Sequence, residues 1–160
     1  LYNPFYALAD NTASCWVARH EMEGDFLILN GDSLVEPAIV DRLLTRATAP
    51  VTVTVDRKTD YDADDMKVQE SIGFLRFTAE GGALFRREVE RVLRTPEGLR
   101  RWYLSVIDTI AKETGKVGTV SIEGMEWGEM DFPADVERNR ALTALWQSRA
   151  PAPAAAIRAV

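Results

Sequence analysis

Apolar residues fall into short runs that predict strands, separated by longer segments with helical spacing. Val51–Val55 alternates Val with Thr, and β-branched side chains favour a strand. Asp25–Asn30 is a short apolar run between turn residues, which predicts a strand buried on both faces. Further strands are predicted over Met66–Val68, Ile72–Phe77 and Val117–Ile122.

Segments with apolar residues three or four positions apart alternate with these strands and predict helices. Asn11 is expected to cap the first helix, because its side-chain oxygen can accept a hydrogen bond from an N–H of the first turn. The alternation predicts an α/β fold with a mainly parallel sheet flanked by helices. The predicted helices are Thr12–Met22, Pro37–Ala47, one opening at Gly81-Gly82, one starting at Thr95-Pro96-Glu97, and one from Pro133 to about Arg149.

The length and composition are those of one globular domain. The chain has 160 residues, of which 46% are hydrophobic and 28% charged, so a disordered chain is not expected. Residues 1–149 are expected to form the domain. The Ala/Pro-rich residues 150–160 are expected to form a flexible tail.

Charge and cysteine content exclude several classes of function. The net charge is −6 and no basic stripe is present, so nucleic-acid binding is not expected. No apolar run approaches the ~20 residues that cross a bilayer, and no signal peptide is visible, so no membrane association is expected. Cys15 is the single cysteine, which fits a reducing, cytoplasmic compartment. His20 is the one other soft ligand, so metal chemistry must come from carboxylates.

The clearest candidate site follows the first predicted strand. Asp32 lies just past its carboxyl end, where open α/β sheets bind ligands, and Gly31 permits a tight turn with room for a ligand. Asp32 is a hard oxygen donor suited to Mg²⁺. The alternative is that Asp32 is only a turn or cap residue, and the local spacing alone favours that alternative.

A second acidic turn lies at Glu126–Asp135, before the helix that Pro133 begins. Asp131 in this turn has helix capping as its alternative role. Both acidic turns follow strands, so both could open on the same edge of the sheet. Asp32 and Asp131 could there hold one Mg²⁺ that also binds nucleotide phosphates.

Other candidate groups have weaker signals. The acidic stretch Asp60–Asp65 is more often a solvated loop than a metal site, and Lys67 after it could meet a phosphate. Trp102 and Tyr103 fit a helix core better than a ligand pocket. With Trp127, Tyr61 and Phe74 they are nevertheless enough aromatics for a quaternary-ammonium pocket, which relies on cation–π attraction.

Several of these strings resemble one family when taken together and in order. They are Asn3–Tyr6 with Asp10, Asn11 and Ser14, then Leu27–Asp32, Asp64–Val68 and Trp127–Val136. Over about Tyr2 to Ala144 the chain resembles the bacterial sugar-phosphate and phosphocholine nucleotidyltransferases, and most nearly their choline-phosphate cytidylyltransferase-like branch. The resemblance implies a Rossmann-like α/β fold. It also implies transfer of a nucleotidyl group from an NTP, with CTP favoured, to phosphocholine or a sugar phosphate, with release of pyrophosphate.

The resemblance also implies roles for individual residues. Asp32 and Asp131 would be the catalytic residues and would bind the cofactor Mg²⁺. Trp102 and Tyr103 would help to form the acceptor pocket. The residues that would bind substrate are Asn11, Gly31, Lys67, Trp102 and Tyr103.

Two departures from the family pattern leave alternatives open. The strand and Gly-x-Gly-x-Arg loop that open the family are not found, so the chain resembles a member that begins after them. The family also has a strand and turn between the segments that correspond to Asp64–Val68 and Glu70–Phe74, whereas here Val68 runs almost straight into Glu70–Phe74.

The alternative function is a non-catalytic α/β module for binding or oligomerisation, as a homo-oligomer that covers a sheet edge. A nucleotide-sugar glycosyltransferase would need an Asp-x-Asp motif, which Asp32–Leu34 does not supply.

Overall fold

The computed structural model describes residues 1–57 and 69–149. The predicted strand Met66–Val68, the acidic stretch Asp60–Asp65 and the predicted tail lie outside these ranges, as do Tyr61 and Lys67. Within the described part of the chain, no helix is both long and apolar enough to cross a membrane.

A sheet of four strands forms the centre of the molecule, in the order β1-β4-β3-β5. β3 and β5 pair in parallel, whereas β4 runs antiparallel to both β1 and β3. The predicted α/β fold is therefore confirmed, with β4 inserted against the common direction of the other three strands. The strands are β1 (Phe26–Leu29), β3 (Val51–Arg57), β4 (Gln69–Phe77) and β5 (Val117–Ser121).

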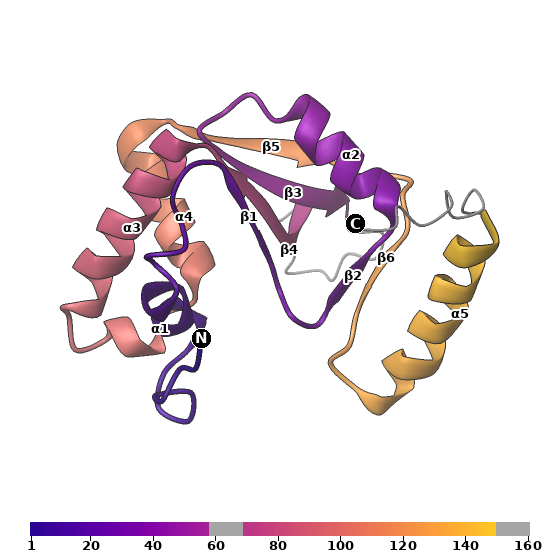
Figure 1. Cartoon of the computed structure of the whole chain (residues 1–160), viewed down its shortest axis with the longest axis horizontal. Helices are drawn as coiled ribbons and strands as arrows, with labels where there is room; N and C mark the ends of the chain where they lie inside the picture. The colour runs from indigo at the N-terminus through magenta and orange to yellow at the C-terminus, as the bar shows by residue number, and fades with distance from the viewer. Residues whose placement is uncertain (58–68, 150–160) are drawn as a thin grey trace, which may run out of the picture.

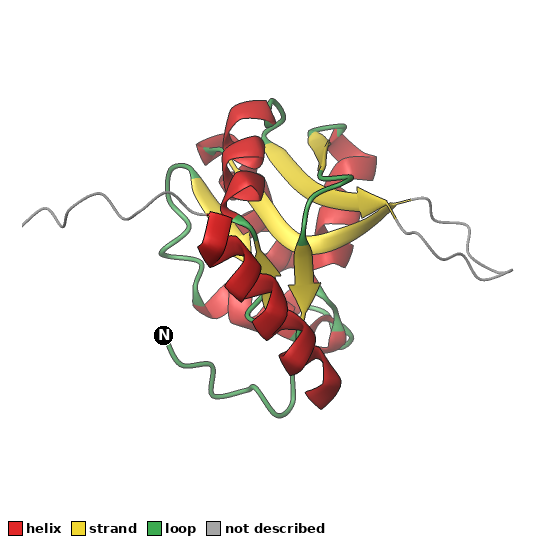
Figure 2. Ribbon diagram, turned by 90° about the vertical axis from the view of Figure 1, so that its right-hand side faces the viewer, coloured by secondary structure: helices red, strands yellow, loops and turns green. Residues whose placement is uncertain are grey.

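Helices cover both faces of this sheet (Figure 1), and Figure 2 shows its twist from the side. On one face, α1 (Asn11–Val17), α3 (Ala79–Leu93) and α4 (Tyr103–Thr114) pack against the Val side chains of β3. On the other face, α2 (Pro37–Arg46) packs Ile39 and Leu43 against β4 and β5. The alternation of side chains along each strand thus divides the core into two clusters.

A second sheet consists of two short antiparallel strands, here called the ribbon. It pairs β2 (Ser33–Val35) with β6 (Trp127–Glu129). The last helix, α5 (Pro133–Arg149), follows β6 and lies at the opposite end of the molecule from α3 (Figure 1). The ribbon therefore joins the region after β1 to the region before α5.

The prediction that β1 is buried on both faces is wrong. Phe26 and Ile28 pack against the core, whereas the side chains of Leu27 and Leu29 are 41% and 45% exposed. The physical reason is that β1 is an edge strand of the described sheet, with helices over one of its faces. Its apolar sequence therefore does not indicate full burial.

Two predicted helices have different bounds. The first ends at Val17, before Met22. The helix predicted from Thr95 begins instead at Tyr103, after the 3₁₀ turn η1 (Gly98–Arg100). The hydroxyl of Thr95 donates to the carbonyl of Val92 at 2.7 Å, so Thr95 closes the end of α3 rather than capping the next helix.

Candidate functional site

Asp32 lies in a closed turn between β1 and β2. The Ser33 N–H donates to the carbonyl of Asn30 at 3.2 Å, and the Ser33 hydroxyl donates to the carbonyl of Ile72 at 3.0 Å. These bonds fix the backbone on both sides of Asp32, while the Asp32 side chain is exposed. Asp32 is not a helix cap, because α2 begins only at Pro37.

Gly31 in this turn does not adopt a left-handed backbone conformation. The turn closes through the hydrogen bond between Ser33 and Asn30 and does not require a left-handed residue at Gly31. A Cβ at Gly31 would meet no atom within 4 Å. The space beside Asp32 is thus open, as binding of a ligand there requires.

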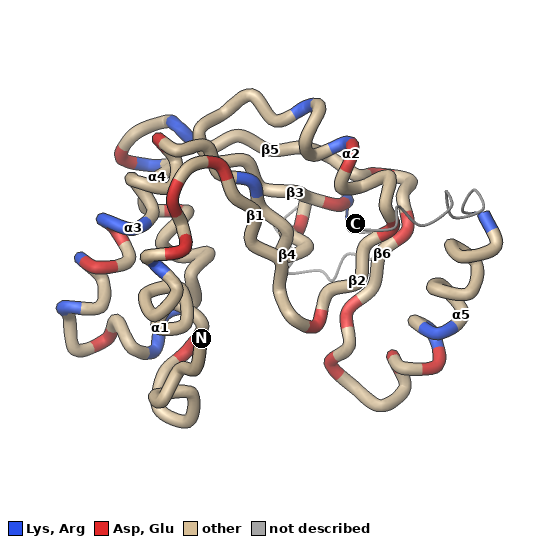
Figure 3. Tube along the Cα trace, in the orientation of Figure 1, with Lys and Arg blue, Asp and Glu red and all other residues tan. Residues whose placement is uncertain are grey.

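The β2–β6 ribbon brings the second acidic turn to the first. Ser33 pairs with Glu129, and the Met130 N–H donates to the carbonyl of Asp32 at 3.0 Å. Asp131 is the next residue. Figure 3 shows acidic positions at the β1–β2 turn and after β6 lying next to one another. The two turns meet through this ribbon, whose two strands are not part of the main sheet.

Asp135, and not Asp131, makes the capping contacts at the start of α5. Its carboxylate accepts hydrogen bonds from the N–H groups of Asp131 at 3.2 Å and Phe132 at 2.9 Å. An acid in the first turn of a helix satisfies free N–H groups and complements the helix dipole. Helix capping, the alternative role given above for Asp131, therefore belongs to Asp135. The Asp131 side chain is exposed.

Glu129 is a third acid at this place, beyond the two aspartates predicted from the sequence. The pKa of its carboxyl is raised, first by burial and then by the nearby Asp131 and Asp32 carboxylates. Glu70 raises it further, and Arg138 opposes the shift. The Glu-x-Asp spacing of residues 129 and 131 was the available signal, because alternate residues of an extended segment share a face.

The chemistry of this donor set fits Mg²⁺. The ion prefers carboxylate oxygens and is usually held by one or two of them together with substrate phosphates. After burial, repulsion from Asp131 and Asp32 also raises the pKa of Glu129, and a cation would relieve this repulsion. Among the described residues, no group of three or more acidic, His or Cys side chains is arranged to hold a metal by itself.

A cavity of about 350 Å³ adjoins Asp32. Asn11, Gly31 and Tyr103, all predicted to bind substrate, line it with Asp32. Asn11 does not cap its own helix as expected. Its side-chain oxygen accepts a hydrogen bond from the Tyr103 N–H at 2.8 Å, so Asn11 caps α4 and ties α1 to it.

Tyr103 and Trp102 differ in their placement. Tyr103 is 2% exposed, and its hydroxyl donates to the Asn30 side chain at 2.9 Å. Burial, with smaller contributions from Cys15 and Asp32, raises the pKa of Tyr103 well above its usual range, so the hydroxyl stays a donor. The Trp102 side chain is 65% exposed and does not line this cavity.

Phe74 and Trp127, also named from the sequence, do not line this cavity. Phe74 is buried in the core beneath α2. The Trp127 indole N–H donates to Asp56 at 2.7 Å. A quaternary-ammonium pocket made of all five predicted aromatics is therefore not formed at this cavity by the described residues.

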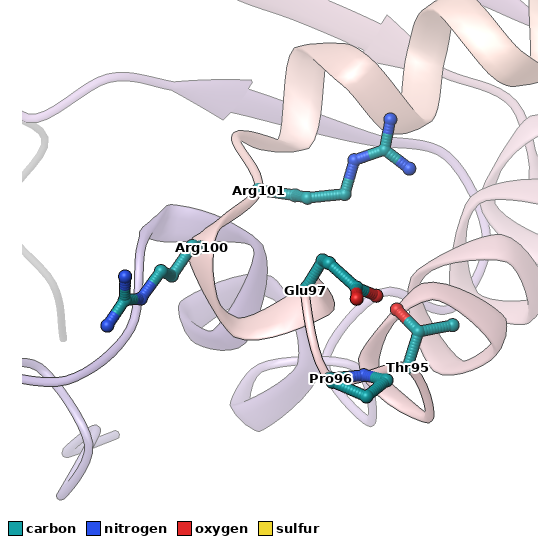
Figure 4. A pocket seen from close by; sticks show the side chains of 5 residues that line it. All are labelled: Thr95, Pro96, Glu97, Arg100 and Arg101. Carbon is teal, nitrogen blue, oxygen red and sulfur yellow. The ribbon is translucent and has the colours of Figure 1, made fainter.

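Another cavity, of about 730 Å³, lies between the end of α3 and η1 (Figure 4). Its charged lining residues are Glu97, Arg100 and Arg101. The side chains of the two arginines point away from one another (Figure 4), so they do not converge on one anion. We assign no function to this cavity.

No protein-family model and no curated protein matches the chain. Solved structures do match it. The chain aligns with the inositol-1-phosphate CTP transferase from T. maritima at a TM-score of 0.68 and 14% identity, over 90% of this chain. It aligns with the CTP:phosphocholine cytidylyltransferase from Streptococcus pneumoniae at a TM-score of 0.70 and 16% identity, over 89% of this chain.

A third structure, described as a glucose-1-phosphate thymidylyltransferase from Bacillus anthracis, aligns at a TM-score of 0.63 and 9% identity, over 84% of this chain. The chain spans 65%, 68% and 61% of the lengths of the T. maritima, S. pneumoniae and B. anthracis proteins. The predicted likeness to nucleotidyltransferases is thus confirmed for the fold. The chain shares its α/β architecture with three proteins that are named as nucleotidyltransferases.

Proposed function

We propose that this chain is the core of a Mg²⁺-dependent nucleotidyltransferase. It would transfer a nucleotidyl group from an NTP to a phosphorylated small acceptor, with release of pyrophosphate. The observation that carries this proposal is the β2–β6 pairing, which holds Asp32 beside the segment of Glu129 and Asp131. CTP is favoured because two of the three structures named above are described by their use of CTP.

Asp32 and Asp131 would hold the Mg²⁺, with the Glu129 carboxylate beside them. When bound, the ion would neutralise charge on the phosphates of the nucleotide. The acceptor phosphate oxygen attacks the α-phosphorus in line, the bond to pyrophosphate breaks, and no covalent enzyme intermediate is needed. The protein therefore acts by positioning and by charge stabilisation. The open space at Gly31 gives the phosphates access to Asp32.

Phosphocholine and sugar phosphates are the candidate acceptors. Trp102 presents an exposed aromatic ring next in sequence to the cavity-lining Tyr103. An exposed ring of this kind attracts a quaternary ammonium group. Phosphocholine would use this contact and a sugar phosphate would not, so Trp102→Ala separates the two acceptors.

The test of the proposal is an assay of pyrophosphate release. Each of the four common NTPs is paired with phosphocholine, glucose-1-phosphate or inositol-1-phosphate, with Mg²⁺ and again after chelation. We expect release with CTP and one acceptor, and loss of release on chelation. Asp41→Asn is the matched control for charge, because Asp41 is an exposed aspartate on α2. Absence of turnover for every pair would contradict the proposal.

A second candidate is a non-catalytic module that binds a partner or a second copy. The observation that favours it is the edge strand β1, where Leu27 and Leu29 are exposed. Exposed apolar edges promote association between chains. Calorimetry with CTP and Mg²⁺, together with sedimentation at several protein concentrations, separates the two candidates. Micromolar CTP binding favours the enzyme, and concentration-dependent assembly without CTP binding favours the module.

A further inference from the structure

We propose that Tyr103 is a positioning residue for the turn that carries Asp32, and that it acts through Asn30. This inference rests on the proposed function, because it concerns the placement of a metal-binding carboxylate. It gives Tyr103 a role different from the acceptor contact that the sequence resemblance implies.

Asn30 connects three parts of the fold. Its side-chain oxygen accepts the hydrogen bond from the Tyr103 hydroxyl at 2.9 Å, which links it to α4. Its N–H donates to the carbonyl of Gly73 at 2.9 Å, which links it to β4. Its carbonyl accepts from the Ser33 N–H at 3.2 Å and closes the turn. Asp32 lies inside this turn, two residues after Asn30.

Gly73 confines the Asn30 side chain from the other side. Its φ is +70°, and a Cβ there would lie 2.3 Å from the Asn30 side-chain nitrogen. The register between β3 and β4 shifts at this segment, as at a β-bulge. The carboxamide therefore lies directly over the Gly73 backbone, with its oxygen toward Tyr103. This arrangement leaves Asn30 little room to move.

Tyr103 is itself held firmly. Its N–H donates to the Asn11 side-chain oxygen at 2.8 Å. Its ring contacts the Phe85 ring edge-on, with ring centroids 6.4 Å apart. A buried donor fixed in this way defines where the Asn30 oxygen lies. Positioning of a catalytic group by a second residue that is itself locked by packing is a general requirement of active sites.

The first experiment compares Tyr103→Phe with Thr109→Val. Tyr103→Phe keeps the ring and removes the hydroxyl. Thr109→Val removes a half-buried hydroxyl from the same helix, one that donates to the Ser105 carbonyl at 3.0 Å. The readouts are ¹⁵N relaxation of the Gly31 and Asp32 N–H groups without metal, and the affinity for Mn²⁺. We expect Tyr103→Phe to increase motion at both groups and to weaken Mn²⁺ binding by about three- to tenfold, the value of one neutral hydrogen bond. Thr109→Val should change neither.

A double-mutant cycle tests the route through Asn30. Asn30→Ala removes the acceptor, so adding Tyr103→Phe to it should weaken Mn²⁺ binding no further. Full additivity of the two effects would overturn the route. Unchanged relaxation of Gly31 and Asp32 in Tyr103→Phe would overturn the positioning role, whatever the metal affinity. Increased motion in Tyr103→Phe, in a parent chain that binds no Mn²⁺, would establish the lock and contradict the proposed function instead.

Discussion

The Met130 N–H donates a hydrogen bond of 3.0 Å to the carbonyl of Asp32, and this bond joins two acidic turns from distant parts of the chain. Pairing of Ser33 with Glu129 continues the contact into the β2–β6 ribbon. Backbone hydrogen bonds therefore bring the acids together even though burial, and then repulsion from Asp131 and Asp32, raises the pKa of Glu129. The placement of the acids depends on strand pairing and not on their own attraction for one another.

Loss of either aspartate should remove Mg²⁺-dependent activity. Asp32→Asn and Asp131→Asn each remove one negative oxygen donor, so turnover should fall on the order of 10²–10³-fold. The measurement is pyrophosphate release as a function of Mg²⁺ concentration, with Asp41→Asn as the control. A variant at either position that keeps near-parental turnover would remove that residue from the site.

Gly73→Ala should destabilise the protein more than Gly24→Ala. Both glycines have a φ of +70°, so both substitutions carry the same left-handed backbone cost of roughly 1–2 kcal/mol. A Cβ at Gly24 meets nothing within 4 Å, whereas at Gly73 it would displace the Asn30 side chain. The extra loss at Gly73 should be at least about 1 kcal/mol, the value of a broken hydrogen bond. Urea unfolding of both variants measures it, and equal losses would contradict the close packing.

The buried thiol of Cys15 should make the protein lose stability in alkali. Burial raises the pKa of Cys15 from 9.0 to about 12. The unfolded chain releases this proton first, so the stabilising contribution is complete below about pH 9 and is lost as pH rises toward about 12. The loss should be on the order of 1 kcal/mol for each pH unit in this window. Urea unfolding at pH 8 and pH 10.5 measures it, and Cys15→Ala should show a smaller fall. An equal fall in the variant would assign the effect to other groups.

Asn139→Ala should loosen α5 from the ribbon. Asn139 is the buried residue of this helix, and its side-chain nitrogen donates to the Glu129 carbonyl at 2.8 Å. Gly128 lies against the same side chain, where a Cβ would be 2.2 Å from the Asn139 oxygen. We expect faster hydrogen exchange along α5, with α4 unchanged as an internal reference. Arg140→Ala, at an exposed neighbouring position, is the control and should leave exchange in α5 near the parental rate.

Sequence patterns predicted the elements well where periodicity was strong. Val51–Val55 and Pro37–Ala47 became β3 and α2 with nearly the predicted bounds, because local propensity and burial agree there. Prediction of the helix caps failed for two different reasons. Asn11 caps α4 instead of its own helix, because its side-chain oxygen accepts from the distant Tyr103 N–H. Thr95 closes α3 through a local bond, because its hydroxyl donates to the Val92 carbonyl three residues earlier.

The sequence by itself determined the α/β class and indicated both aspartates as candidate site residues, since strand and helix periodicities are local and an acid after a strand is visible in the chain. Only the tertiary structure decided that these aspartates meet through the β2–β6 ribbon, that Glu129 joins them, and that Tyr103 reaches Asn30. The physical reason is that strand register and long-range hydrogen bonds depend on how distant segments pack. No local pattern of residues encodes which of the available partners a buried donor will find.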